Sequence, residues 1–127
     1  MLFHIQGRIV PYTRMTQRSK WTDRAKRYLS SQDAIAGQLW RQMRDNDWQA
    51  LPDNTPLSIR LFVWQPSGLH KCDLSNVLKA VEDAAQGIVF RNDCWVDKIE
   101  TGRYLGSEYR CEFLIEIMES ETNDATN

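Results

Sequence analysis

Cysteines are few in this sequence, and their spacing excludes two functional classes. The 127 residues include three cysteines, Cys72, Cys94 and Cys111, and no two of them form a CxxC pair. An odd number of widely spaced cysteines suits neither a disulfide framework nor a dithiol redox site. We therefore expect reduced thiols and no redox chemistry.

Long apolar runs are also missing. No stretch approaches the roughly 20 apolar residues that a membrane-spanning helix requires, and residues 1–8 do not show a basic segment followed by an apolar one. The latter pattern is the mark of a secretory signal. From these two absences we expect a cytoplasmic protein that has no membrane partner.

The length and composition favour one globular domain. A chain of 127 residues, 42% of them hydrophobic, can bury one core but is too short for two ordinary ones. The last segment is strongly polar and lacks the apolar residues needed to pack against a core. We predict a domain over residues 1–118 and a disordered polar tail over residues 119–127.

Net charge is close to zero, at −1, but the charges are unevenly distributed. Residues 1–44 hold nine Lys/Arg and two Asp/Glu, whereas residues 45–127 hold seven and fifteen, so the two parts carry +7 and −8. Clustered Lys and Arg are typical of a polyanionic partner because they displace counterions from phosphates. In the basic segment 12–21, Arg14, Arg18 and Lys20 are the residues predicted to contact the phosphates of such a partner. Two oppositely charged faces that only promote solubility remain an alternative.

Hydrophobic periodicity predicts six elements of secondary structure. Apolar residues alternate in residues 2–10 and 57–64, as in strands, and recur every three or four positions in residues 23–47 and 74–86, as in helices. Residues 95–104 and 108–118 are predicted to form a terminal hairpin around Gly106 and Ser107. Thr22 is a candidate N-cap for the first helix. The order β-α-β-α-β-β favours a single α+β domain with two helices packed on a mixed or antiparallel sheet.

Two aspartates stand at predicted element ends that can converge. Asp73 precedes the second helix and Asp93 precedes the following strand. Mg²⁺ takes oxygen ligands and needs only one or two carboxylates when water and a phosphate complete its shell. Lys79 lies about 9 Å along the helix from Asp73, where its ammonium could reach a phosphate held at the metal, whereas Asp83 lies about 15 Å away. Each residue also has a structural interpretation, as an N-cap, a solvated helix residue or a turn former.

A zinc site is an alternative to the carboxylate site. His70 and Cys72 would lie on one face of an extended segment, and with Cys94 they offer the nitrogen and sulfur ligands that zinc favours. This set has no fourth ligand at a diagnostic spacing, so the carboxylate site is preferred.

The polar segments of the sequence resemble the RusA-type Holliday junction resolvases. The resemblance lies in KCDLSNVLK at residues 71–79, DA at 83–84, GIV at 87–89 and NDCWV at 92–96. The family typically shows K-P-D-x-D-N-L-x-K, D-A-L, G and D-D-x-Q-V at these places. Gly7, Pro11, Arg14 and Thr16 resemble its opening segment, so the likeness covers most of residues 5–105.

The resemblance implies a homodimeric, Mg²⁺-dependent endonuclease that binds four-way DNA junctions and nicks two strands symmetrically, with Mn²⁺ as an alternative ion. It implies that Asp73 and Asp93 bind the metal and that Lys79 is the catalytic lysine. Ser75 occupies a catalytic position of the family, and Lys71 and Asn76 are predicted DNA contacts.

Two positions depart from the family pattern and leave alternatives open. Ser75 stands where the family has an aspartate, and Asn92 replaces the first of two paired acids. A hydroxyl is a weaker Mg²⁺ ligand than a carboxylate. The alternatives are compensation by another acid, a binding protein for branched DNA without nuclease activity, or an inactivating change. The candidate compensating acids are Glu82, Asp97 and Glu100. Glu82 lies about 10 Å along the helix from Ser75 and is therefore a poor substitute.

Overall fold

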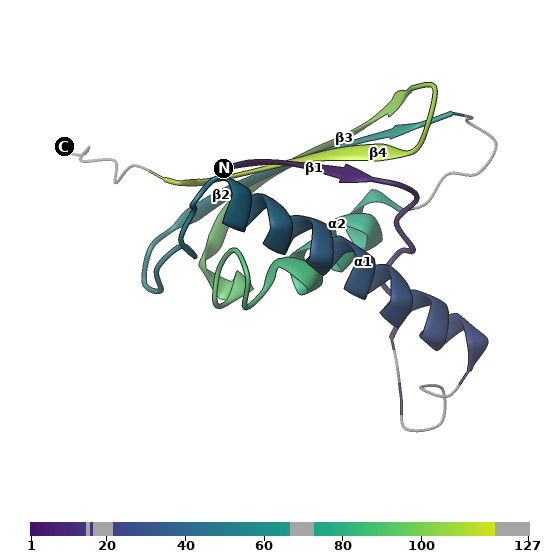
Figure 1. The fold of residues 1–127 in the computed structure, drawn as a ribbon, viewed down its shortest axis with the longest axis horizontal. Helices are drawn as coiled ribbons and strands as arrows, with labels where there is room; N and C mark the ends of the chain where they lie inside the picture. The colour runs from purple at the N-terminus through teal and green to yellow at the C-terminus, as the bar shows by residue number, and fades with distance from the viewer. Residues whose placement is uncertain (15, 17–21, 67–72, 119–127) are drawn as a thin grey trace.

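A computed structural model describes residues 1–14, 16, 22–66 and 73–118 of the chain. It contains four strands, two α-helices and one 3-10 turn (Figure 1). In chain order these are β1 (Leu2–Gln6), α1 (Asp23–Asp45), β2 (Leu57–Gln65), α2 (Leu74–Ala85), η2 (Asp93–Trp95), β3 (Val96–Leu105) and β4 (Arg110–Ile117). The predicted α+β class and the predicted order of the six main elements are confirmed.

The four strands form one mixed sheet in the order β1-β4-β2-β3. Strand β4 runs antiparallel to both of its neighbours, and β2 runs parallel to β3. The parallel pair is connected through α2, because parallel neighbours need a long crossover and a helix supplies it. This connection brings the start of α2 to the end of the sheet at which β2 finishes.

The predicted terminal hairpin is wrong. Strands β3 and β4 do not pair with each other, because β2 lies between them and bonds to both. The connection from β3 to β4 crosses the end of β2: the Gly106 N–H donates to the Gln65 carbonyl, and a Cβ on Gly106 would lie 3.1 Å from the Trp64 Cβ. Glycine permits this close crossing because it has no Cβ. In the sequence alone, the segment around Gly106 cannot be told from a hairpin turn.

Both helices cover the same face of the sheet, and the hydrophobic core lies between these two layers (Figure 1). The apolar stripes predicted for the helices supply one side of this core and alternate strand residues supply the other. Fully buried side chains include Phe3, Ile5, Leu39, Leu57, Ile59, Leu61, Val81, Val89, Phe90, Phe113 and Ile115. Burial raises the pKa of the Cys111 thiol to about 12, so that this cysteine is a neutral core residue.

Most element boundaries lie close to those predicted. The first strand is shorter than expected and ends at Gln6, because Gly7 adopts a left-handed backbone conformation with φ of 96°. The predicted cap of α1 is confirmed, since the Thr22 hydroxyl oxygen accepts from the Ala25 N–H at 3.2 Å. Residues 119–127, the predicted tail, lie outside the described residues. In the described part of the chain no helix has the length and apolar character needed to cross a membrane.

The outer edge of β1 is occupied by two glutamines of α1. The Gln42 side-chain amide accepts from the His4 N–H at 2.9 Å and donates to the His4 carbonyl at 2.7 Å. Gln38 makes the same pair of bonds with Gln6, at 2.8 and 3.1 Å. These side chains satisfy backbone groups that would otherwise be open to a further strand.

Candidate active site

Asp73 forms the N-cap of α2 and is fully exposed. Its Oδ1 accepts from the Ser75 N–H at 2.9 Å and from the Ser75 hydroxyl at 2.5 Å. These hydrogen bonds, chiefly the one from the Ser75 hydroxyl, lower the pKa of Asp73, and the positive charge of Arg103 acts in the same direction. The structural interpretation as an N-cap is therefore correct, and it leaves an ionised carboxylate at the surface.

Lys79 joins α2 to the segment that follows it. Its ammonium nitrogen lies 3.2 Å from Asp83 Oδ1, one turn further along the helix, and 3.6 Å from Asp93 Oδ2 at the start of η2. Both carboxylates raise the pKa of Lys79, with the hydrogen bond to Asp83 contributing most. Lys79 is therefore a fixed cation between two carboxylates that are ten residues apart in the sequence.

Two tyrosines lie beside this lysine. The Lys79 ammonium is 5.9 Å from the centre of the Tyr12 ring, which packs edge-to-face against Tyr28 of α1. The Tyr28 hydroxyl donates to Asp83 Oδ2 at 3.3 Å. Burial first, and then the charge of Asp83, raises the pKa of Tyr28, so the hydroxyl keeps its proton and remains a donor. Asp83 is therefore held from two sides and in turn orients Lys79.

Glu82 is the buried acid of this group, with 9% of its surface exposed. Loss of hydration, followed by the negative charge of Asp93, raises the pKa of Glu82, whereas the charge of Lys79 lowers it. Lys79, Glu82, Asp83 and Asp93 form one charged group, which we call the Lys79 cluster. Glu82 and Asp83 were not predicted as members, although their spacing of three and four residues from Lys79 places them on its side of the helix.

Asp73 and Asp93 have different partners. Ser75 bonds to Asp73, whereas Lys79 pairs with Asp93, and six helical residues, or about 9 Å of rise, separate Asp73 from Lys79. Within the described ranges, no group of three or more His, Cys, Asp or Glu could hold a metal ion. The available oxygen donors fit a hard cation such as Mg²⁺ only where water and a substrate phosphate supply most of its ligands.

The other predicted site residues fall into two groups. Arg14 and Asn76 are described and exposed, and the Asn76 carbonyl accepts from the Tyr12 N–H at 2.9 Å, which ties the segment after β1 to α2. Arg18, Lys20 and Lys71 lie outside the described residues, as do His70 and Cys72 of the alternative zinc site.

In the described part of the chain, none of the candidate compensating acids forms a hydrogen bond or ion pair with Ser75 or Asp73. Glu100 is on β3 and pairs with Arg60 of β2 at 3.4 Å, and Asp97 is exposed on the same strand. Glu82 belongs to the Lys79 cluster. Among the described residues, the hydroxyl of Ser75 itself is the oxygen that directly contacts Asp73.

Comparison with protein families gives a match to the family described as endodeoxyribonuclease RusA, over residues 7–117. The matched region spans every described element except β1. It confirms the family resemblance seen in the polar motifs. Comparison with curated proteins gives no match.

Proposed function

Because the chain belongs to the RusA family of endodeoxyribonucleases, we propose that it is a Mg²⁺-dependent nuclease that resolves four-way DNA junctions. It acts as a homodimer in the cytoplasm and introduces paired symmetric nicks, since a two-fold dimer matches a two-fold substrate. The observation that best supports this proposal is the position of Lys79, fixed beside Asp93 on the helix that Asp73 begins.

The described residues provide three chemical roles for phosphodiester hydrolysis. The carboxylates of Asp73 and Asp93 would hold Mg²⁺, or Mn²⁺ in its place, and the bound ion would supply an activated water and an electrophile. The ammonium of Lys79 offsets the negative charge that develops on the phosphoryl oxygens during in-line attack. Asp83 and Tyr28 keep that ammonium in one orientation.

A second candidate function is binding of branched DNA without cleavage. It is favoured by the bond from the Ser75 hydroxyl to Asp73 Oδ1, because the family has a carboxylate at position 75. A neutral hydroxyl there reduces the negative charge available to hold a divalent cation. Under this alternative, the fold and its DNA contacts persist while turnover is weak or absent.

A junction-cleavage assay tests both candidates. Labelled four-way junction and linear duplex are incubated with the protein in EDTA, Mg²⁺ or Mn²⁺, and binding is measured in parallel by gel shift. We expect the junction to be cut in millimolar Mg²⁺ and Asp73→Asn to reduce the rate at least 100-fold while binding persists. Cleavage that survives Asp73→Asn would contradict the assignment of this site.

Ser75→Asp separates a weak nuclease from a binding protein. The substitution restores the second carboxylate, so we expect faster cleavage at low Mg²⁺ and a lower Mg²⁺ concentration for half-maximal rate. Ser75→Asn, a neutral change at the same position, is the matched control. Activity that appears only in Ser75→Asp supports the binding protein, and equal rates in all three proteins show that position 75 does not limit the reaction.

A further inference from the structure

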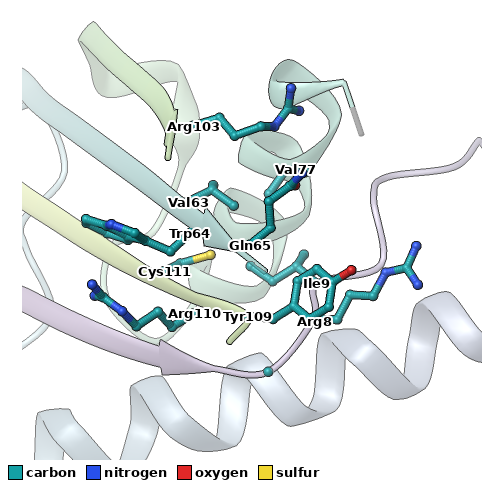
Figure 2. A pocket seen from close by; sticks show the side chains of 11 residues that line it. Arg8, Ile9, Val63, Trp64, Gln65, Val77, Arg103, Tyr109, Arg110 and Cys111 are labelled. Atoms are coloured by element: carbon teal, nitrogen blue, oxygen red, sulfur yellow. The ribbon is translucent and has the colours of Figure 1, made fainter. Parts of the chain in front are cut away.

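A pocket lined by three arginines lies at the end of the sheet where β2 and β3 finish (Figure 2). Arg8 follows β1, Arg103 comes from β3 and Arg110 begins β4, so three separate parts of the sequence contribute a positive charge. Residues such as Val63 and Cys111 form an apolar floor, and no Asp or Glu lines the pocket. The lining therefore carries three positive charges and no negative one.

The three arginines differ in how far they are engaged. Arg110 pairs with Glu112 at 3.2 Å, and its guanidinium lies 3.9 Å from the centre of the Trp64 ring. Arg8 lies over the Tyr109 ring at 5.7 Å. Neither Arg8 nor Arg103 forms an ion pair with another residue of the described ranges. These two guanidinium groups therefore have free donors for an incoming anion.

The pocket is next to the candidate active site. Val77, on the first turn of α2, forms part of its lining, and Asp73 is the N-cap of the same helix. A DNA strand whose scissile phosphate lies at Asp73 would therefore bring neighbouring backbone phosphates close to Arg103 and Arg8.

We propose that two successive backbone phosphates of the DNA strand next to the scissile phosphate bind at the rim of this pocket, one at Arg103 and one at Arg8, whose guanidinium groups point in different directions (Figure 2). The inference rests on the proposed function, which supplies the strand. A guanidinium presents paired N–H donors that match two phosphate oxygens, and the apolar floor reduces competition from water. Arg110 stays stacked on Trp64 as a wall of the pocket and adds its charge.

Paired substitutions test this site. Arg8→Gln/Arg103→Gln is compared with Arg41→Gln/Arg44→Gln, which removes the same charge from the last turns of α1. Binding to junction and to linear duplex is measured in EDTA over a range of salt concentrations. We expect the pocket variant to bind junction about tenfold more weakly at ~0.1 M salt and to lower the salt slope by about 2, because each phosphate contact contributes about 1 to that slope.

A spectroscopic measurement makes the test independent of how well the variants fold. In unsubstituted protein with labelled arginine, the Nε–Hε signals of Arg8 and Arg103 should shift when junction is added, and should shift much less with equal concentrations of inorganic phosphate. Equal responses to DNA and to free phosphate would contradict the DNA assignment. Signals that do not respond to bound junction would overturn the pocket.

The outcomes distinguish this proposal from the nuclease proposal. Weakened binding by the pocket variant alone supports the pocket even where no protein cuts DNA. Junction binding and cleavage that are the same in both double variants would overturn the pocket and leave the nuclease proposal intact. Failure of the unsubstituted protein to bind any DNA at low salt would overturn both.

Discussion

At the scale of single residues, the ammonium of Lys79 is held by more contacts than a surface lysine usually has. Asp83, Asp93 and the ring of Tyr12 surround it, and Tyr28 fixes Asp83 from α1. An isolated surface ion pair contributes little to stability, generally less than about 1 kcal/mol. This arrangement is better explained as a means of orienting the lysine than as a source of stability.

Replacement of Asp83 should therefore reduce cleavage more than it reduces binding. We expect Asp83→Asn to slow junction cleavage about tenfold or more, since small displacements of a catalytic group can cost up to about 100-fold. The substitution also removes the main cause that raises the pKa of Lys79, so the loss of rate at alkaline pH should move to lower pH.

The control for this prediction is Asp33→Asn, which removes an exposed carboxylate from α1. It should leave both the rate and its dependence on pH unchanged. Single-turnover rates and junction affinities are measured for both variants across the pH range. If the cleavage rate of Asp83→Asn falls at the same alkaline pH as that of the unsubstituted protein, Asp83 does not act through Lys79.

Glu82 makes the stability of the domain depend on pH. Burial raises its pKa in the folded state, so the folded protein holds this proton more tightly than the unfolded chain does. The stabilisation is complete below the unfolded pKa of about 4.3 and is lost as pH rises through the folded pKa. Glu82→Gln keeps a neutral side chain, so we expect it to melt at a higher temperature than the unsubstituted protein at pH 7.

Thermal unfolding followed by circular dichroism at pH 4 to 8, without divalent ions, checks this expectation. The difference in melting temperature should shrink as pH falls toward 4, where both side chains are neutral. Glu116→Gln, at an exposed position on β4, is the control and should show no such trend. A lower melting temperature for Glu82→Gln at pH 7 would mean that ionised Glu82 stabilises the Lys79 cluster.

At the scale of elements, α1 both covers the core and closes an edge of the sheet. Its buried stripe packs on the strands, while Gln38 and Gln42 bond to the backbone of β1. These glutamines are one helical turn apart and meet alternate residues of the strand, because the rise of four helical residues, about 6 Å, nearly equals that of two strand residues.

Removal of both glutamine side chains should weaken this attachment. We expect Gln38→Ala/Gln42→Ala to lower the free energy of unfolding by about 1–2 kcal/mol, since each net hydrogen bond contributes about 1 kcal/mol and these lie at the surface. The opened strand edge should also increase aggregation. Urea unfolding and light scattering measure the two effects.

Arg41→Ala provides the matched control on the same helix. Its side chain is exposed, so truncation should change stability by less than about 0.5 kcal/mol. Equal stabilities for the double glutamine variant and this control would show that the bonds to β1 contribute nothing measurable.

At the scale of the whole molecule, the proposed mechanism requires two active sites for one junction. A single domain of this size carries one copy of Asp73 and one Lys79 cluster, whereas paired nicks need two. We therefore expect sedimentation velocity to show a species of two chains and the junction to saturate at two chains per four-way junction.

Mixed dimers test by activity whether paired nicks need two active chains. Unsubstituted chains mixed with excess Asp73→Asn chains should still nick one strand but should rarely cut both within one binding event. Supercoiled plasmid carrying an extruded cruciform reports the difference, as nicked rather than linear product. If the mixed dimers gave the same fraction of linear product as the unsubstituted protein, each strand would not need its own active chain.

The sequence by itself determined the features that depend on local spacing. Helical periodicity placed α2 and its buried face, and the polar motifs were sufficient for the family. These signals survive without coordinates because a residue's position on a helix or strand follows from its count along the chain. An N-cap was only one of the roles that the sequence left open for Asp73.

Tertiary structure alone decided which distant residues meet. Strand β2 lies between β3 and β4, and Lys79 contacts Asp93 and Tyr12. Arg8 and Arg103 border one pocket. Each of these arrangements joins separate segments of the sequence. The physical reason is that strand pairing depends on how the helices and the sheet pack to bury their shared apolar faces. Short turn residues such as Gly106 and Ser107 are compatible with either a hairpin or a crossing over β2, and packing of the whole domain selected the crossing.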